Sequence, residues 1–267
     1  MQLFSRILGN GEPLIILHGL FGMSDNWLTI GKALADRGFT VHLPDLRNHG
    51  RSPHSNTHRY TDMSDDLLNY LDEHEIDRCH LIGHSMGGKL AMIFSLLYPE
   101  RVTKLVVVDI APSDYQLSGD TFHHDLINTL QDIDLRGYSE RATIRQELEQ
   151  RLGDQRLAAF LTKNIARDDQ NVFFWKFNLP VLQKYLNHIQ IGFKELEAYA
   201  PCPVSTVFIK GNDSDYYLPQ HEQDRTFFFP NSAVRGIDNA GHWVHSEQPE
   251  IFIDTLLESL RDTKKSG

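Results

Sequence analysis

Short, mostly apolar runs constrain the fold of this chain most strongly, because they recur between longer segments with helical periodicity. Most of these runs are continuously apolar and do not alternate with polar residues, as expected of strands covered on both faces of a parallel sheet. Strand–helix alternation of this kind predicts an α/β architecture. The predicted strands are residues 13–19, 40–46, 79–85, 104–110, 204–210 and 232–238.

Helical patterns fill the intervals between these strands in two parts of the chain, before residue 111 and after residue 200. One pattern ends at Gly38, a residue type that favours helix ends. Another opens at Thr61 and carries acidic residues in its first turn, where they suit the positive end of a helix. The predicted helices are residues 25–38, 61–74, 86–98 and 249–262.

The alternation stops between about residues 111 and 200. This segment contains helical patterns and no convincing strand, and a strand-like run resumes at 204–210. We interpret the segment as a helical cap inserted before the penultimate strand of one sheet, and an independent helical domain is the alternative. The expected division is a core of residues 1–110 and 201–267 with a cap of residues 111–200.

The amino-acid composition limits where in the cell this protein is expected and which molecules it is expected to bind. The 267 residues include no stretch of the roughly 18 apolar residues that a membrane helix needs, and the N-terminal residues do not resemble a secretory signal. Cys79 and Cys202 are the only cysteines, which favours a reducing compartment such as the cytoplasm. A net charge of −10 argues against nucleic acid and anionic membranes as partners, and would repel an anionic substrate.

A candidate nucleophile lies in the stretch "LIGHSMGGK", which contains Gly83-x-Ser85-x-Gly87. In a nucleophile elbow, a serine occupies a strained turn between a strand and a helix, and the flanking glycines avoid clashes where the backbone doubles back. The motif alone is weak. Here it follows a predicted strand and precedes a predicted helix, which is the context that supports it.

A serine hydroxyl needs a neighbouring base, usually histidine, to become a nucleophile at neutral pH. His242 in "NAGHWVH" follows the last predicted strand and precedes the last helix, in the chain order typical of such enzymes. His245 is the alternative. His84 is adjacent to Ser85, but neighbours on a tight turn point apart, so a structural or substrate-lining role is expected for it.

A metal site is not expected. His49, His54 and His58 are clustered in the sequence, but their spacing matches no zinc motif and the segment reads as a loop. The predicted chemistry therefore involves no metal.

Acyl transfer also requires hydrogen-bond donors for the oxyanion of the tetrahedral intermediate. In the strand–elbow–helix arrangement these are two backbone N–H groups, one after the nucleophile and one from the loop after an earlier strand. Met86 supplies the first. The second comes from "HGLFG", where Leu20 is the main candidate and Phe21 the alternative.

Five motifs in chain order resemble the α/β-hydrolase superfamily and, within it, the YbfF-type esterases. The combination of "RNHGRS" and "GHSMGGK" is specific for that branch, although many relatives carry glycine where this chain has Asn48. The motifs are "LHGLFG…NW" (17–27), "PDLRNHGRSPHS" (44–55), "GHSMGGK" (83–89), "VVVDIAP" (106–112) and "AGHWVHSEQP" (240–249).

The resemblance implies an α/β-hydrolase fold and a Ser-His-acid esterase that needs no cofactor. It implies small-molecule acyl esters or thioesters as substrates, acyl-CoA among them. The cap, which would set the substrate choice, is the part of the chain that the motifs cover least.

The catalytic acid has several candidates in the sequence. In α/β-hydrolases it usually lies about three residues after a glycine that follows the strand after the cap, and counting from Gly211 reaches Ser214. Asp213 and Asp215 flank this serine. The other position is the end of the strand after the elbow helix, where "VVVDIAP" places Asp109. A half-buried carboxylate there requires a partner. The resemblance also favours Asp109, with Ser214 as a neutral member of the same cluster.

The substrate pocket can be predicted only in outline. Arg47 and Arg51 are the nearest candidates to contact an anionic leaving group such as CoA, with loop-anchoring salt bridges as the alternative. Each candidate lining side chain could equally belong to the core. These candidates are Phe21, Trp27, Asn48, His49, His84, Trp175 and Trp243.

Two classes of function follow from these residues. The first is a serine esterase or thioesterase that forms an acyl-enzyme, with a C–C bond hydrolase as a related possibility. The second is a non-catalytic ligand-binding protein on the same fold, because a fold does not determine a function.

Overall fold

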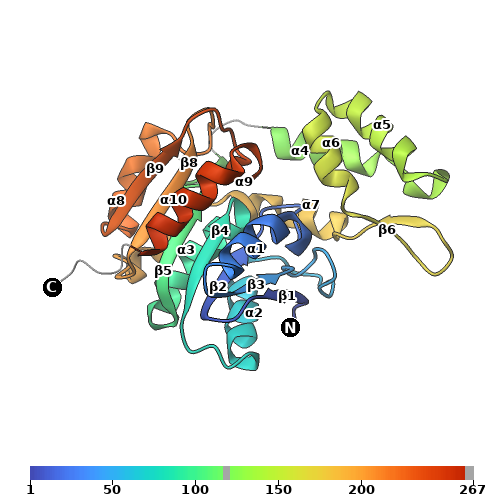
Figure 1. Cartoon of the computed structure of the whole chain (residues 1–267). Coiled ribbons are helices and arrows are strands. Elements are labelled where there is room, and N and C mark those ends of the chain that lie inside the picture. Colours follow the sequence, from blue (N-terminus) through green and yellow to red (C-terminus); the bar gives the residue numbers. More distant parts are fainter. Residues whose placement is uncertain (117–120, 262–267) are drawn as a thin grey trace.

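The computed structural model describes residues 1–116 and 121–261, and its centre is a seven-stranded sheet in the order β1-β3-β2-β4-β5-β8-β9 (Figure 1). Every neighbouring pair is parallel except β1 and β3, which are antiparallel. The strands are β1 Ser5–Leu8, β2 Glu12–Leu17, β3 Phe39–Pro44, β4 Cys79–His84, β5 Val102–Val108, β8 Thr206–Gly211 and β9 Ser232–Ile237.

The six strands expected from the sequence are all present, and the parallel α/β architecture is confirmed. β1 was not expected. It is a four-residue edge strand with no fully buried residue, so it lacks the continuous apolar run that marks the central strands. Edge strands of this kind are exposed to solvent on one side and tolerate polar residues.

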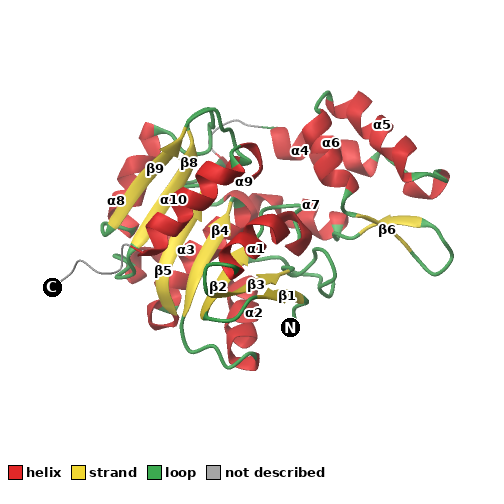
Figure 2. Ribbon diagram, viewed as in Figure 1, coloured by secondary structure: helices red, strands yellow, loops and turns green. Residues whose placement is uncertain are grey.

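Helices cover both faces of the sheet, as Figure 2 shows. Ile15 and Leu17 of β2 face one apolar layer, and Leu14 and Ile16 face the other, because successive side chains of a strand point to opposite sides. The first layer contains α2 Tyr60–Glu73, α3 Met86–Leu97 and α8 Glu222–Phe228. The second contains α1 Leu28–Ala35, α9 Val244–Glu247 and α10 Pro249–Arg261.

The chain between β5 and β8, here called the cap segment, forms a third apolar cluster of its own. Phe21 of the core belongs to this cluster, so the cap segment packs against the loop that follows β2. In Figure 1, α4 to α6 lie beyond one end of the sheet. The elements of the cap segment are α4 Phe122–Gln131, α5 Arg141–Leu152, α6 Gln155–Thr162, β6 Ile165–Arg167, β7 Phe173–Trp175 and α7 Leu179–Gln190.

The expectation of a cap segment without strands is wrong in one place. β6 and β7 pair as an antiparallel hairpin. Each strand has three residues, which is too short to show strand periodicity in the sequence. The side chain of Asp168 closes the connecting loop by accepting hydrogen bonds from the N–H groups of Gln170 and Val172.

Short 3-10 helices complete the described elements. No helix in residues 1–116 and 121–261 combines the length and apolar content needed to cross a membrane. The 3-10 helices are Ser24–Trp27, Pro99–Arg101, Leu135–Gly137, Lys194–Tyr199 and Pro219–His221.

Candidate active site

Ser85 lies on a strained turn between β4 and α3, with φ 53° and ψ −120°. A Cβ atom on Gly83 would lie 2.2 Å from the carbonyl oxygen of Gly87, and one on Gly87 would lie 2.4 Å from the carbonyl oxygen of Leu17. Neither position can therefore accept a side chain without moving the backbone. The two glycines of the motif allow the elbow to form and place the serine at the carboxyl edge of the sheet.

Asp109 is the carboxylate that meets the ring of His242. Its Oδ2 atom lies 2.8 Å from His242 Nδ1, which donates because a carboxylate only accepts. The Ser214 hydroxyl donates to the same oxygen, and the Gly211 N–H donates to Oδ1 over 3.0 Å. Asp109 is 1% exposed, so these contacts supply the partners that a buried charge requires.

Asp213 and Asp215 are both exposed, and neither is bonded to His242 among the described contacts. Contacts of the loop explain why the side chains of Asp213 and Asp215 are exposed and do not reach His242. The Asp213 N–H donates to the Ala240 carbonyl oxygen, and the buried Ser214 side chain turns inward between the two aspartates. The structure thus brings Asp109 and Ser214 to the histidine, and leaves the two loop aspartates in solvent.

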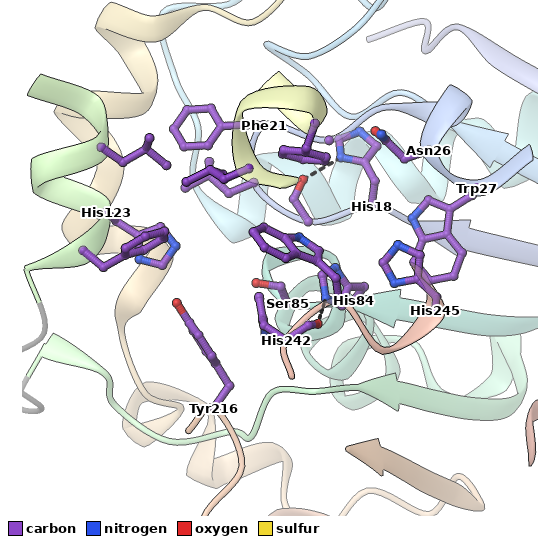
Figure 3. Close-up of a pocket in the computed structure, with 18 residues that line it drawn as sticks. His18, Phe21, Asn26, Trp27, His84, Ser85, His123, Tyr216, His242 and His245 are labelled. Carbon is purple, nitrogen blue, oxygen red and sulfur yellow. Dashed lines mark hydrogen bonds between the residues drawn. The ribbon is translucent and has the colours of Figure 1, made fainter. Parts of the chain in front are cut away.

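His242 lines the same cavity as Ser85 (Figure 3). Its Nδ1 atom is bonded to Asp109, so Nε2 is the ring nitrogen that does not face this carboxylate. The ring stacks on Tyr216 with 3.9 Å between centroids. His84 Nε2 donates to the backbone oxygen of His242 over 2.8 Å and so helps to hold the loop that carries His242.

His245, the alternative base, occupies a different position. Its ring stacks on Trp27 at 4.1 Å, and burial lowers its pKa to about 3, so it is neutral at physiological pH. Burial also holds the pKa of His84 well below its usual value. Neither ring contacts Asp109 among the described hydrogen bonds, so of these three histidines only His242 pairs with the carboxylate there.

Leu20 and Phe21, in the turn after β2, are the two candidates for the second oxyanion donor, and only one of their N–H groups is available. The N–H of Phe21 is already donated to His49 Nε2 at 3.2 Å. The N–H of Leu20 has no acceptor in the part of the chain that the structure describes. Met86 is the first residue of α3, so its N–H has no partner within the helix. Leu20 and Met86 are therefore the two available donors.

Two cavities meet at Ser85. We call the first the histidine arm, because it is lined by His18, His84, His242 and His245 together with Trp27 and Trp243. We call the second the aliphatic arm, because Met86, Ile110, Leu186 and Ile189 line it, with Lys89 and Tyr115 beside them. Both arms share Leu20, Ser85, His123 and Tyr216.

The predicted pocket residues divide into two groups. Phe21, Trp27, His84 and Trp243 line the histidine arm as expected. The other three do not line either arm, because contacts elsewhere in the fold hold them. They are Asn48, bonded to Thr57, Ser55 and Asn178; His49, bonded to Phe21 and Arg47; and Trp175, stacked on Phe177.

Arg47 is not free to contact an anionic substrate. Its guanidinium donates to the carboxylate of Asp66 over 2.6 Å and lies 3.4 Å from that of Asp62. The salt-bridge alternative is therefore the one that the structure supports. Within residues 1–116 and 121–261, no group of three or more His, Cys, Asp or Glu side chains is arranged to hold a metal ion.

His123, Tyr216, Leu186 and Ile189 line the arms but were not predicted. They come from the cap segment and from the loop after β8, which reach the elbow only in the folded chain. No local motif marks them. Lys89, by contrast, is part of the "GHSMGGK" motif, and its complete burial could have been suspected from a lysine on an otherwise apolar helix.

Comparison with known proteins agrees with this geometry. Residues 12–249 match the model of the alpha/beta hydrolase fold family. Esterase YbfF of Escherichia coli (strain K12) is 34% identical over 253 residues, covering 95% of this chain and 94% of the relative. An sn-1-specific diacylglycerol lipase of Danio rerio is 36% identical over 259 residues, covering 95% of this chain and 80% of the relative.

A solved structure described as a marine microorganism esterase shares 39% of its residues with this chain. The two superpose with a TM-score of 0.93, covering 97% of this chain and 99% of the other. The resemblance to YbfF-type esterases is thereby confirmed, as is the expected fold. This chain belongs to the alpha/beta hydrolase family and is an ester hydrolase.

Proposed function

We propose that this protein is a serine esterase that cleaves acyl esters through an acyl-enzyme, with Ser85 as nucleophile, His242 as base and Asp109 as the acid that orients the base. The observation that carries the proposal is the 2.8 Å contact between Asp109 and His242 beside a serine elbow in the same cavity. A base held by a buried carboxylate is the arrangement that activates a serine hydroxyl.

The proposed reaction has two halves. His242 Nε2 takes the proton of the Ser85 hydroxyl as its oxygen attacks the ester carbonyl, and the oxyanion accepts hydrogen bonds from the N–H groups of Leu20 and Met86. The intermediate collapses, the C–O bond to the alcohol breaks, and His242 returns the proton to the leaving oxygen. Water then attacks the acyl-enzyme by the same route, which releases the acid and regenerates Ser85.

The two arms suggest which part of the substrate lies where. The leaving oxygen must lie beside the histidine that protonates it. His242 lines the histidine arm and does not line the aliphatic arm. We therefore assign the alcohol to the histidine arm and the acyl chain to the aliphatic arm, whose Ile110, Leu186 and Ile189 walls suit a hydrocarbon chain.

An acyl-CoA thioester is the other substrate class that the sequence resemblance implied, and we rank it below uncharged oxygen esters. The outer cavity next to His242 is lined by Asp114, Asp154 and Asp215, and the whole chain carries a net charge of −10. Phosphate groups would be repelled there. Of the two arginines predicted from the sequence, Arg47 is paired with Asp62 and Asp66, and the guanidinium of Arg51 lies over the ring of Phe4.

A reducing location is part of the same proposal. Cys79 and Cys202 are both free and buried, and burial raises the pKa of each thiol. Protonated, buried thiols fit the cytoplasm that the cysteine content suggested. Fractionation of cells that express the full chain tests this location.

A substrate panel tests the proposed function. Wild type, Ser85→Ala and His242→Ala are assayed with p-nitrophenyl esters of increasing acyl length and with the matching acyl-CoA thioesters. We expect turnover of esters by the wild type, a loss of at least about 10³-fold in both variants, and weaker activity on CoA thioesters.

Labelling separates the enzyme from a binding protein. A fluorophosphonate should label Ser85 in the wild type, as identified by mass spectrometry, and should leave Ser85→Ala unlabelled. Absence of turnover and of labelling in a folded wild-type protein would contradict the esterase assignment and favour the non-catalytic alternative.

A further inference from the structure

The turn that carries the proposed oxyanion donor is held in an unfavourable conformation. Gly22 N–H donates to the Gly19 carbonyl oxygen over 2.9 Å, which makes Leu20 and Phe21 the two central residues. Phe21 has φ 59°. A positive φ at the third position is typical of a type II turn, where glycine is the usual residue, and it is strained for a bulky side chain. Something outside the turn must stabilise this conformation.

Two buried side chains hold both peptide groups of Phe21. His49 Nε2 accepts its N–H at 3.2 Å, and Asn164 Nδ2 donates to its carbonyl oxygen at 2.7 Å. His49 lies in the core, in the loop after β3, whereas Asn164 lies in the cap segment between α6 and β6. Both are 0% exposed. The turn is thus clamped from the core on one side and from the cap segment on the other.

The tautomer of His49 is determined by its second contact. Its Nδ1 atom lies 3.0 Å from the backbone oxygen of Arg47, which only accepts, so Nδ1 carries the proton and Nε2 is an acceptor. Burial and the neighbouring rings of His18 and His58 keep the pKa of His49 well below its usual value. The neutral ring therefore remains available to the Phe21 N–H.

The direction of the Leu20 N–H depends on the same turn. The carbonyl oxygen of its own peptide group, Gly19 O, accepts from Gly22 N–H and from His18 Nδ1 over 2.9 Å. A trans peptide is planar, so its N–H points opposite to that carbonyl. Figure 3 shows His18, Phe21 and Ser85 around the same cavity. His49 and Asn164 hold the peptide groups on either side of Phe21, and so keep the turn in the strained conformation from which the Leu20 N–H projects.

We propose that His49 and Asn164 are positioning residues that keep the Leu20 N–H aimed at the oxyanion, so that the cap segment contributes to catalysis as well as covering the substrate. This inference rests on the proposed esterase function. It explains why His49 and Asn164 are buried away from the substrate cavities and still bond to the loop that lines one of them. Oxyanion donors act through preorganisation, so a loosened donor lowers kcat more than it raises KM.

The test compares hydrogen-bond-deleting and hydrogen-bond-conserving variants. In Asn164→Leu the side chain keeps a similar size and loses its single described hydrogen bond, because Oδ1 has no partner within the described residues. His49→Leu removes the acceptor, and His49→Gln can place an amide oxygen near the position of Nε2. We expect kcat for a p-nitrophenyl ester to fall by roughly 10-fold or more in both leucine variants, with KM within about twofold, and to recover in part in His49→Gln.

A matched control separates positioning from general stability. Asn178 is another cap-segment asparagine, and its side chain donates to the Asn48 side chain and the Ser55 carbonyl oxygen without touching the turn. Asn178→Leu should lower the melting temperature about as much as Asn164→Leu while leaving kcat close to wild type. Affinity for a trifluoromethyl ketone, which forms an oxyanion with the serine, should fall only in the His49 and Asn164 leucine variants.

Two outcomes would overturn the inference while the esterase assignment stands. One is a folded Asn164→Leu protein with wild-type kcat and ketone affinity. The other is an equal loss of kcat in Asn178→Leu. If Asn164→Leu does not fold, His49→Leu and His49→Gln decide the question: equal kcat in these two variants contradicts the clamp. A wild-type protein without Ser85-dependent turnover would instead remove the proposed function itself.

Discussion

The carboxylate of Asp109 lies 2.8 Å from the Nδ1 atom of His242, although 133 residues separate them in the sequence. Ser214, which occupies the position where the family usually carries its acid, donates its hydroxyl to the same carboxylate oxygen. β5 and β8 are neighbours in the sheet, so the loops that follow them open at the same edge. An acid can therefore move from one loop to the other and still reach the same histidine.

Replacement of Asp109 by asparagine should be far more damaging than replacement of either loop aspartate. The amide can no longer hold the His242 tautomer and stabilise the imidazolium, and we expect kcat to fall by about 10⁴-fold. Asp213→Asn and Asp215→Asn should stay within about threefold of wild type, because both side chains are exposed. Steady-state kinetics on one p-nitrophenyl ester measures all three, and a larger loss at Asp213 would contradict the proposed role of Asp109.

Ser214 should matter less than Asp109 but more than its neighbours. Its hydroxyl is one of three donors to the Asp109 carboxylate, and a hydrogen bond to a charged group contributes about 1.5–3 kcal/mol. We expect Ser214→Ala to lower kcat by roughly 10-fold and Ser214→Thr, which keeps the hydroxyl, to remain close to wild type. If alanine and threonine variants were equally impaired, the effect would come from packing and not from the hydrogen bond.

How much of this molecule could be predicted differs between its parts. The central strands were predictable because burial on both faces imposes a continuous apolar run, and β1 and the β6–β7 hairpin were not, because they are short and partly exposed. Ser85 and His242 were predictable because each lies in a local motif. Asp109 required a choice between two loops that only the sheet brings together.

Sequence patterns could not predict which side chains line the two arms of the site. Asn48 and His49 lie near predicted catalytic loops and Trp175 lies in the cap segment. Contacts with Asn178, Phe21 and Phe177, respectively, hold them outside the two arms. Leu186 lies on α7 and Tyr216 in the loop after β8, and the two line the same cavity only in the folded chain. Their positions depend on how the cap segment packs, and no periodicity records that.

Buried histidines should make the fold sensitive to acid. Burial lowers the pKa of His42 to about 4 and that of His58 and His245 to about 3, whereas a histidine in the unfolded chain has its ordinary pKa of about 6.5. Unfolding therefore takes up protons below pH 6.5, and stability that is constant above this pH is lost as the pH falls toward 4. Each such histidine contributes a slope of about 1.4 kcal/mol per pH unit.

Urea unfolding at pH 7.5, 6.0 and 5.0 measures this dependence. For three histidines we expect a loss of about 4 kcal/mol per pH unit in the lower half of the range. His42→Gln should reduce this slope by about 1.4 kcal/mol per pH unit, the contribution of one proton, because the amide does not titrate. A free energy of unfolding that is independent of pH between 7.5 and 5.0 would show that these rings are protonated in the folded protein.

The elbow glycines should be irreplaceable, in contrast to a glycine in open space. A Cβ atom on Gly87 would lie 2.4 Å from the carbonyl oxygen of Leu17 and 2.5 Å from that of His18, both backbone atoms of the neighbouring strand end. We expect Gly87→Ala to cost about 4 kcal/mol or more, or to prevent folding. Gly137→Ala is the control, because its Cβ would meet nothing within 4 Å. Thermal unfolding followed by circular dichroism distinguishes the two, and equal melting temperatures would show that the backbone can adjust around the elbow.

The assignment of the two arms predicts that one residue of α7 controls the acyl chain and not the alcohol. Leu186 is 1% exposed and lines the aliphatic arm. Leu186→Ala should shift the preference toward longer acyl chains and Leu186→Trp toward shorter ones, since each added methylene that is buried contributes about 0.8 kcal/mol, or roughly fourfold in kcat/KM.

Two ester series separate the arms in this experiment. In one, the acyl chain is lengthened on a constant p-nitrophenol, and in the other, the alcohol of a constant acetate is lengthened. Leu186 variants should change only the first profile. Leu182→Ala is the matched control, because Leu182 lies one turn earlier on the same helix, is 0% exposed and lines neither arm. A change confined to the alcohol series would reverse the assignment, with the acyl chain in the histidine arm and the leaving group beneath α7.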